Sequence, residues 1–160
     1  MDPAVRAEIL DILENAADMT IATIRPDGYP QATTVSFAHD GLSIFFGTGS
    51  SSQKARNIAV NRKVSLAVSL PYAHWGEIRG ISLGGQAEPL RHASRIEHAA
   101  DLLLRKFPQG IAEYASGELS GVAFFEVTPA VISLLDYRKG FGHKELVRIT
   151  RTDAKTGTGS

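Results

Sequence analysis

The chain has 160 residues, a length typical of one folded domain with a single hydrophobic core. It carries 17 basic and 17 acidic side chains, so no net charge exists to attract nucleic acid or an anionic membrane surface over long range. The chain has no cysteine, which excludes disulfides, thiolate metal sites and cysteine nucleophiles.

The first predicted element is an amphipathic helix near the N-terminus. Asp2 can cap this helix and Pro3 suits its first position, and apolar residues then recur at helical spacing as far as about Ala17. Three alternating strands should follow the helix, over residues 19–25, 31–38 and 42–48. Turn residues such as Gly28 separate them, and we interpret the three strands as an antiparallel meander.

A loop of small residues comes next and leads into a short helix. Ser51 or Ser52 can cap this helix, which should end near Val60. The remaining predicted elements are a strand, a long strand, a helix, one or two strands around Pro129 and a last strand, over residues 64–69, 77–90, 94–107, 122–137 and 145–150. Glycines in the long strand indicate that it is bent or bulged.

Six or more strands with a few helices on an antiparallel core favour a barrel over a sheet of βαβ units. We therefore predict a mainly β fold of the α+β type, with at least six antiparallel strands and flanking helices. Residues 1–151 should form a single domain. Residues 152–160 are small, polar and rich in glycine and threonine, so we expect them to form a disordered tail.

The stretch over residues 45–57 can hold an anion. A strand leads there into a loop and then into a helix, whose first backbone N–H groups have no partner within the helix and suit a phosphate. The hydroxyl groups of residues 50–52 and the positive charges of Lys54 and Arg56 would strengthen such a site. The alternative is an ordinary serine-capped helix with two solvated basic residues. No hydroxyl residue follows Lys54, so the pattern of a P-loop is absent.

The strand over residues 31–38 offers a second candidate surface. Val35 and Phe37 should lie on one face of this strand, with Thr34 and Ser36 on the other. Hydroxyl groups in this strand could hydrogen-bond the polar edge of a ring system, although such residues are also typical of a strand with one solvated face.

Other classes of site have little support in the sequence. None of the five histidines forms the i, i+4 pair of a metalloprotease helix, and we expect no metal site. No basic patch alternates with aromatic residues, which argues against a nucleic-acid interface. No apolar run approaches the ~20 residues of a membrane span and the N-terminus lacks the pattern of a signal peptide, so we expect a cytoplasmic protein.

Four short motifs occur in a particular order along the chain: Gly28-Tyr29-Pro30, Ser52-Gln53-Lys54-Ala55-Arg56-Asn57-Ile58, Asn61-Arg62-Lys63-Val64-Ser65-Leu66 and Gly85-Gln86-Ala87-Glu88. In this order they resemble the FMN-binding split barrels of the pyridoxamine 5'-phosphate oxidase-like family. The resemblance is clearest over residues 19–90 and extends more loosely to residue 149. It implies a split β-barrel and FMN as the cofactor.

The resemblance also implies which residues bind the cofactor. The isoalloxazine ring would lie along one strand and the end of the next, at Thr33, Thr34, Val35, Ser36, Phe46 and Thr48. The phosphate would be held at the start of the following helix, by Ser51, Ser52, Gln53 and Lys54. Two C-terminal residues match positions that reach the flavin in some members, Tyr137 and His143. The flavin lies at a dimer interface in this family, so a homodimer is implied.

The chain departs from the true oxidases of the family at the substrate positions. Those oxidases carry an arginine where Thr33 stands, a basic residue where Gln53 stands and a C-terminal Arg/His motif from which residues 137–144 differ. We therefore predict FMN-dependent oxidoreductase activity on an unknown substrate rather than oxidation of pyridoxamine phosphate. No residue stands out as a catalytic acid or base. The alternatives are a flavin- or haem-binding protein without turnover and a deazaflavin-dependent reductase.

Overall fold

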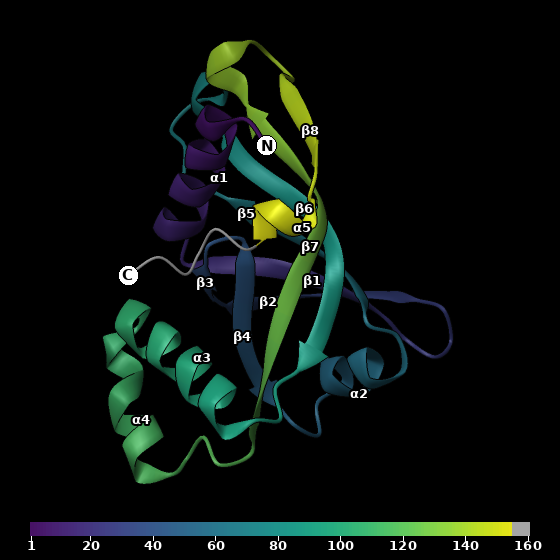
Figure 1. Ribbon diagram of the computed structural model, residues 1–160, viewed down its shortest axis with the longest axis vertical. Helices are drawn as coiled ribbons and strands as arrows, with labels where there is room; N and C mark the ends of the chain where they lie inside the picture. The colour runs from purple at the N-terminus through teal and green to yellow at the C-terminus, as the bar shows by residue number, and fades with distance from the viewer. Residues whose placement is uncertain (155–160) are drawn as a thin grey trace.

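The structure is a computed structural model that describes residues 1–154, and eight strands dominate it. The strands are β1 (Asp18–Ile24), β2 (Pro30–Ser36), β3 (Ala38–Asp40), β4 (Ser43–Gly49), β5 (Lys63–Ser69), β6 (Arg79–Pro89), β7 (Val122–Asp136) and β8 (Lys144–Arg148). They form one antiparallel sheet in the order β2-β1-β5-β6-β7-β4-β3, and β8 also pairs with β7. The sheet curls into a half-barrel (Figure 1), which confirms the predicted fold class.

Helices and 3-10 turns surround this sheet. The helices are α1 (Pro3–Asn15), α2 (Gln53–Val60), α3 (Ala93–Lys106), α4 (Ile111–Ser116) and α5 (Arg151–Ala154), and the 3-10 turns are η1 (Trp75–Glu77), η2 (Pro108–Gly110) and η3 (Tyr137–Lys139). The first three helices confirm their predictions. The sequence did not predict α4, because six residues are too few to show a helical period. The helix α5 includes the first residues of the predicted tail, and residues 155–160 lie outside the described part of the chain.

The N-terminal elements form as their residues dictate. The Asp2 carboxylate accepts hydrogen bonds from the backbone N–H groups of Ala4 and Val5 and so caps α1. The strands β1 and β2 pair along their whole length through a tight turn, in which Gly28 has a φ of 88°. Glycine reaches this left-handed conformation without steric cost, which explains its place in the turn.

The predicted meander is wrong at its third strand. The chain leaves the β1–β2 hairpin at Phe37, and β4 pairs with β3 and β7 instead of β2. The reason is the side chain of Phe37, which is fully buried in the core, so the predicted strand over residues 31–38 bends there into two strands. As a result, β2 and β4 lie side by side without pairing, where the curled sheet does not close.

The long strands β6 and β7 form the centre of the sheet. The register between them shifts at Gly84 and Gly85, which confirms the predicted bulge. A Cβ atom on Gly85 would lie 2.5 Å from the carbonyl oxygen of Thr128, so only glycine fits this approach of the two backbones. Pro129 faces Gly85 at the bulge, where its missing N–H is tolerated, and β7 continues past it as one strand.

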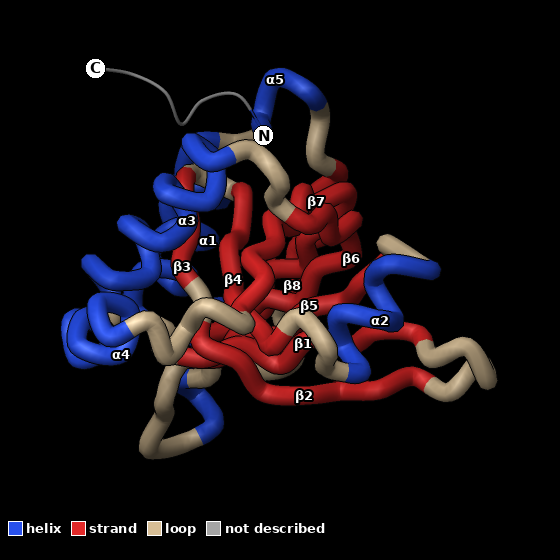
Figure 2. The backbone as a smooth tube through the Cα atoms, turned by 90° about the horizontal axis from the view of Figure 1, so that it is seen from below, coloured by secondary structure: helices blue, strands red, loops and turns tan. Residues whose placement is uncertain are grey.

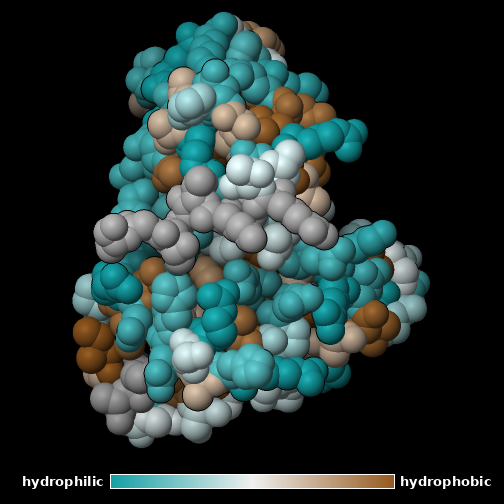
Figure 3. Space-filling model, in the orientation of Figure 1, coloured by the Kyte–Doolittle hydropathy of each residue, from teal (hydrophilic) through white to brown (hydrophobic). Residues whose placement is uncertain are grey.

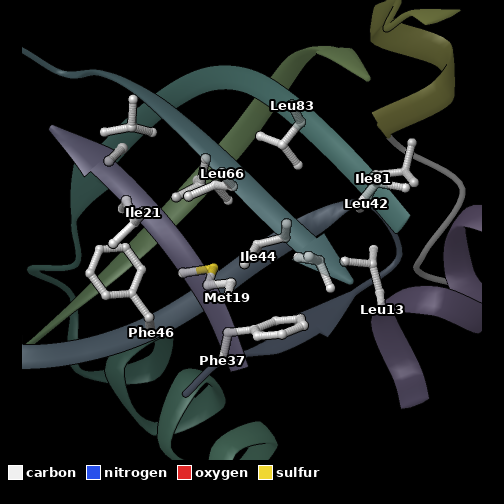
Figure 4. Packing of buried hydrophobic residues seen from close by; sticks show 14 of the residues in the cluster. Leu13, Met19, Ile21, Phe37, Leu42, Ile44, Phe46, Leu66, Ile81 and Leu83 are labelled. Atoms are coloured by element: carbon white, nitrogen blue, oxygen red, sulfur yellow. The ribbon is translucent and has the colours of Figure 1, made fainter. Parts of the chain in front are cut away.

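The hydrophobic core fills the concave side of the sheet (Figure 4). Phe37 and Phe46 are fully buried there, and each contributes roughly 1.5–3 kcal/mol of transfer free energy. The helix α1 covers one end of this core with its apolar residues Ile9, Ile12 and Leu13. Seen from below, α3 and α4 lie on one side of the sheet and α2 on the other (Figure 2).

A group of paired charges fastens α1 to the far ends of β6 and β7. The Arg79 guanidinium donates to Glu8 Oε2 and Asp11 Oδ2, both at 2.6 Å. The Arg138 guanidinium donates to Glu8 and to both oxygens of Asp136, whose side chain is only 2% exposed. These hydrogen bonds from Arg138 hold the pKa of Asp136 below its ordinary value. We call these five side chains the α1 ion cluster.

Candidate functional site

The start of α2 is a serine-capped helix N-terminus, as the sequence predicted. The Ser52 hydroxyl accepts a hydrogen bond from the backbone N–H of Ala55 at 3.2 Å, and it lies 3.3 Å from the Thr48 hydroxyl. The Ser51 side chain is exposed at this helix start. Such a terminus carries partial positive charge and presents backbone N–H groups to an anion.

The most unusual residue of this region is Lys54. Its side chain belongs to the buried face of α2 and the residue is only 9% exposed. Within residues 1–154, the Lys54 ammonium has neither a hydrogen bond nor an acidic side chain within ion-pair distance. Burial lowers the pKa of Lys54, because the charged form loses hydration without gaining a partner. A buried amine of this kind is a strong candidate for binding an anion.

A polar network beneath α2 joins this helix to the β1–β2 hairpin. Asn57 is fully buried, and its amide nitrogen donates to Thr23 Oγ1 at 2.9 Å and to Gln31 Oε1 at 3.1 Å. Its amide oxygen accepts from Gln53 Nε2 at 2.8 Å. Gln53, predicted to touch a phosphate, is thus engaged in holding the helix in place.

Asn57 was missed by the sequence analysis, although a signal for it exists. It lies three residues after Lys54 and one before the fully buried Ile58, so an amide side chain occupies the face of a short helix that faces the core. A buried amide needs several hydrogen-bond partners, and Asn57 finds them on two strands.

The residues predicted along β2 fall on two different faces. Thr33 and Val35 are half-buried on the face that also carries Gln31, whereas Thr34 and Ser36 are exposed on the other face. The Thr33 hydroxyl is buried and has no hydrogen-bond partner in the described part of the chain. The Ser36 hydroxyl, in contrast, donates to Asp18 at 3.1 Å. A ring lying against one face of β2 could therefore contact either Thr33 and Val35 or Thr34 and Ser36, but not all four side chains.

The strand β2 has a free edge, because it pairs with β1 alone. Backbone N–H and C=O groups along such an edge have no partner in the sheet and can bind a polar ring edge-on. The predicted residues from Thr33 to Ser36 all belong to this edge strand, although their side chains point to opposite faces.

Two other groups of predicted residues are placed apart from this region. Phe46 points into the core, where its fully buried ring stacks on Phe125 at 5.2 Å between centroids, so its side chain cannot reach a ligand (Figure 4).

Tyr137 and His143 lie at the opposite end of the molecule from α2, around η3 and the start of β8 (Figure 1). His143 Nε2 lies 3.2 Å from Glu145 Oε1 there. One copy of the chain does not bring these residues to the α2 site.

The described residues offer no group of three or more His, Asp or Glu side chains that could hold a metal ion. None of the helices among residues 1–154 has the length and apolar character needed to cross a membrane.

The sequence of this chain matches one known family over most of its length. The family model for pyridoxamine 5'-phosphate oxidase matches residues 5–136. The chain belongs to this family. No curated protein matches its sequence.

Solved structures share the fold. A heme binding protein from Mycobacterium smegmatis superposes with a TM-score of 0.77 and 19% identity, over 92% of this chain and 59% of that protein. A conserved hypothetical protein from Mycobacterium tuberculosis superposes with a TM-score of 0.75 and 24% identity, over 95% and 94% of the two chains. A heme storage protein from Vibrio cholerae superposes with a TM-score of 0.60 and 18% identity, over 77% of this chain and 88% of that protein. At these identities the likeness shows the fold alone.

Proposed function

We propose that this member of the pyridoxamine 5'-phosphate oxidase family binds FMN and acts as an FMN-dependent oxidoreductase. The observation that carries the proposal is the buried ammonium of Lys54, which has no counter-charge among residues 1–154 and belongs to the first turn of α2. A phosphate placed there would supply the missing negative charge. It would also accept hydrogen bonds from the Ser51 hydroxyl and from the backbone N–H groups of the helix start.

The ring of the flavin would lie along the free edge of β2. The unpaired backbone groups of this edge can hydrogen-bond the polar side of the ring, and the half-buried Thr33 lies on the same edge strand. When bound, the flavin supplies the redox chemistry, and the protein contributes binding, orientation and electrostatics. The network around Asn57 would fix the angle between α2 and β2, and with it the distance between the phosphate and ring sites.

We further propose that the working form is a homodimer. Tyr137 and His143 match flavin-contacting positions of the family, yet they lie far from α2 in the same chain. A second copy could bring them to the site. Exposed aromatic side chains beside them support an interface, because Phe141 is 78% exposed and packs against both Tyr137 and Trp75.

The binding experiment compares FMN with riboflavin, which lacks the phosphate. Lys54→Ala should weaken FMN binding about 10- to 100-fold, because a hydrogen bond to a charged group contributes roughly 1.5–3 kcal/mol. Riboflavin should bind wild type and variant equally. The matched control is Arg56→Ala on the same helix, since Arg56 is exposed and its guanidinium is already bonded to Gln53 and to the Ser51 carbonyl. Flavin fluorescence titration measures all six affinities.

The competing ligand in this test is haem, since two of the similar structures are heme proteins by name. A Soret band after incubation with haemin, without any uptake of FMN, would overturn the proposal. A second test measures electron transfer from bound FMN to an added quinone, after reduction by NADH, NADPH or light. If FMN binds but no such transfer occurs, the protein is a flavin binder and not an enzyme.

A further inference from the structure

A cavity of about 400 Å³ lies beside the place where the curled sheet fails to close. Its walls come from β2, β4, α3, η2 and the segment that leads into β7. The volume is in the range of about 300–1,000 Å³ that is usual for small-molecule sites. One of several apolar patches in Figure 3 lies on the α3–α4 side. Ile111 of α4 is 53% exposed.

Among the described residues, the lining of this cavity carries no charged side chain. Its apolar walls include Leu103, Leu104, Phe107 and Phe124, and the polar groups come from Ser36 and Gln109. Two other cavities of the molecule contain several charged residues each, such as Lys106 in one and Arg91 in the other. An ion placed among apolar side chains would lose its hydration and find no counter-charge, which costs free energy. The uncharged lining therefore favours a neutral ligand.

The cavity shares two wall residues with the candidate flavin site. Val35 and Ser36 belong both to its wall and to the β2 stretch along which the ring would lie. Gly47 of β4 forms another part of the wall, and a Cβ atom there would lie 2.9 Å from Val122 Cγ1. Because Gly47 has no side chain, its strand β4 can lie close to Val122 at the wall of the cavity.

We propose that this cavity binds an uncharged, largely apolar ring compound and is the substrate pocket of the flavin site. The assignment to a flavin rests on the proposed function above, whereas the preference for a neutral ligand rests on the lining alone. Gln109, which is exposed on η2, is the group available to hydrogen-bond a carbonyl or hydroxyl of that compound.

The experiment uses the neutral fluorescent probe N-phenyl-1-naphthylamine, whose emission rises on entering an apolar site. Leu103→Trp should fill the cavity and weaken probe binding at least about tenfold, which is 1.4 kcal/mol. The matched control is Leu102→Trp, one residue earlier on α3 and equally half-buried, because Leu102 lines a different cavity. On wild type, 1-naphthol should displace the probe at least about tenfold better than 1-naphthoate, which has the same ring system and a negative charge.

Equal probe binding by wild type and both variants would overturn the proposal, as would equal displacement by 1-naphthol and 1-naphthoate. A Leu103→Trp variant that changes the sedimentation coefficient but not probe affinity would show that a second copy covers the cavity, which also overturns it. FMN titration of the same proteins separates the two proposals. Probe binding with loss at Leu103→Trp and no FMN uptake supports the neutral-ligand cavity and refutes the flavin.

Discussion

Buried charges are paired at one end of the described molecule, and a buried charge lacks a partner at the other end. In the α1 ion cluster the buried Asp136 carboxylate accepts three hydrogen bonds from Arg138, and Arg79 bonds two carboxylates of α1. At the start of α2 the Lys54 ammonium is buried with no partner in the described chain, and the Thr33 hydroxyl is buried and unpaired. Paired buried charge holds a fold together, whereas unpaired buried charge costs stability, and the proposed phosphate would remove this cost at Lys54.

The largest effect should come from breaking the α1 ion cluster. Arg138→Ala leaves the buried Asp136 carboxylate without its main partner, so we expect the free energy of unfolding to fall by about 2–3 kcal/mol. For a chain of this length the melting temperature should drop by roughly 5–10 °C. The measurement is urea unfolding followed by circular dichroism.

The control for Arg138→Ala is Arg25→Ala. Arg25 also pairs with an aspartate two residues away, but both partners are exposed, at 44% and 49%. An exposed pair contributes only about 0–1 kcal/mol, so Arg25→Ala should leave stability nearly unchanged. Equal losses in the two variants would show that burial of Asp136 is not what makes its pair important.

A second prediction concerns the buried amide of Asn57 beneath α2. Asn57→Ala should lower the free energy of unfolding by about 2 kcal/mol, because it removes the buried partner of Thr23 and links between α2 and the hairpin. It should also weaken FMN binding, since the helix start loses its fixed position. Asn15→Ala serves as the control because Asn15 is exposed and bonds only within α1. If both variants unfold at the same urea concentration, the network around Asn57 contributes nothing measurable to the free energy of unfolding.

A third prediction runs in the opposite direction. Lys54→Met should stabilise the protein without ligand by about 1 kcal/mol, or roughly 2–4 °C, because it replaces an unpaired buried ammonium by an apolar side chain of similar length. The same change should abolish the preference for FMN over riboflavin. Lys63→Met, on the exposed side of β5, should do neither. A less stable Lys54→Met would mean that the ammonium has a stabilising partner after all.

The smallest effects should appear in the dependence of stability on pH. The pKa of Asp136 is lowered by its bonds to Arg138, so its contribution is present above the ordinary value near 3.8 and is lost as pH falls through the folded pKa. The pKa of Lys54 is lowered by burial, so the unfolded chain binds more protons than the folded chain below the ordinary value near 10.5. Stability should therefore rise with pH up to that value. Burial also lowers the pKa of Lys106, so part of this alkaline rise should remain in Lys54→Met. The rise should be smaller in Lys54→Met than in the wild type, which unfolding midpoints between pH 8 and 10.5 would reveal.

The local elements of the protein followed from its sequence. The Asp2-capped α1, the turn at Gly28, the serine-capped α2 and the bulge of β6 each depend on a few neighbouring residues, whose preferences do not need the rest of the fold. The family also followed, because it depends on motifs within short segments, whereas the anion site at α2 stays a prediction.

Long-range relations were decided only by the tertiary structure. Phe37 bends the chain because its ring is buried in a core built from distant strands, and this moved β4 from β2 to β7. The same packing left Lys54 without a counter-charge among the described residues, buried Phe46 in the core and put Tyr137 and His143 at the far end from α2. A sequence records which side chains are present, whereas desolvation and partnership arise from elements far apart in the chain, and these decide which charges are buried and which are paired.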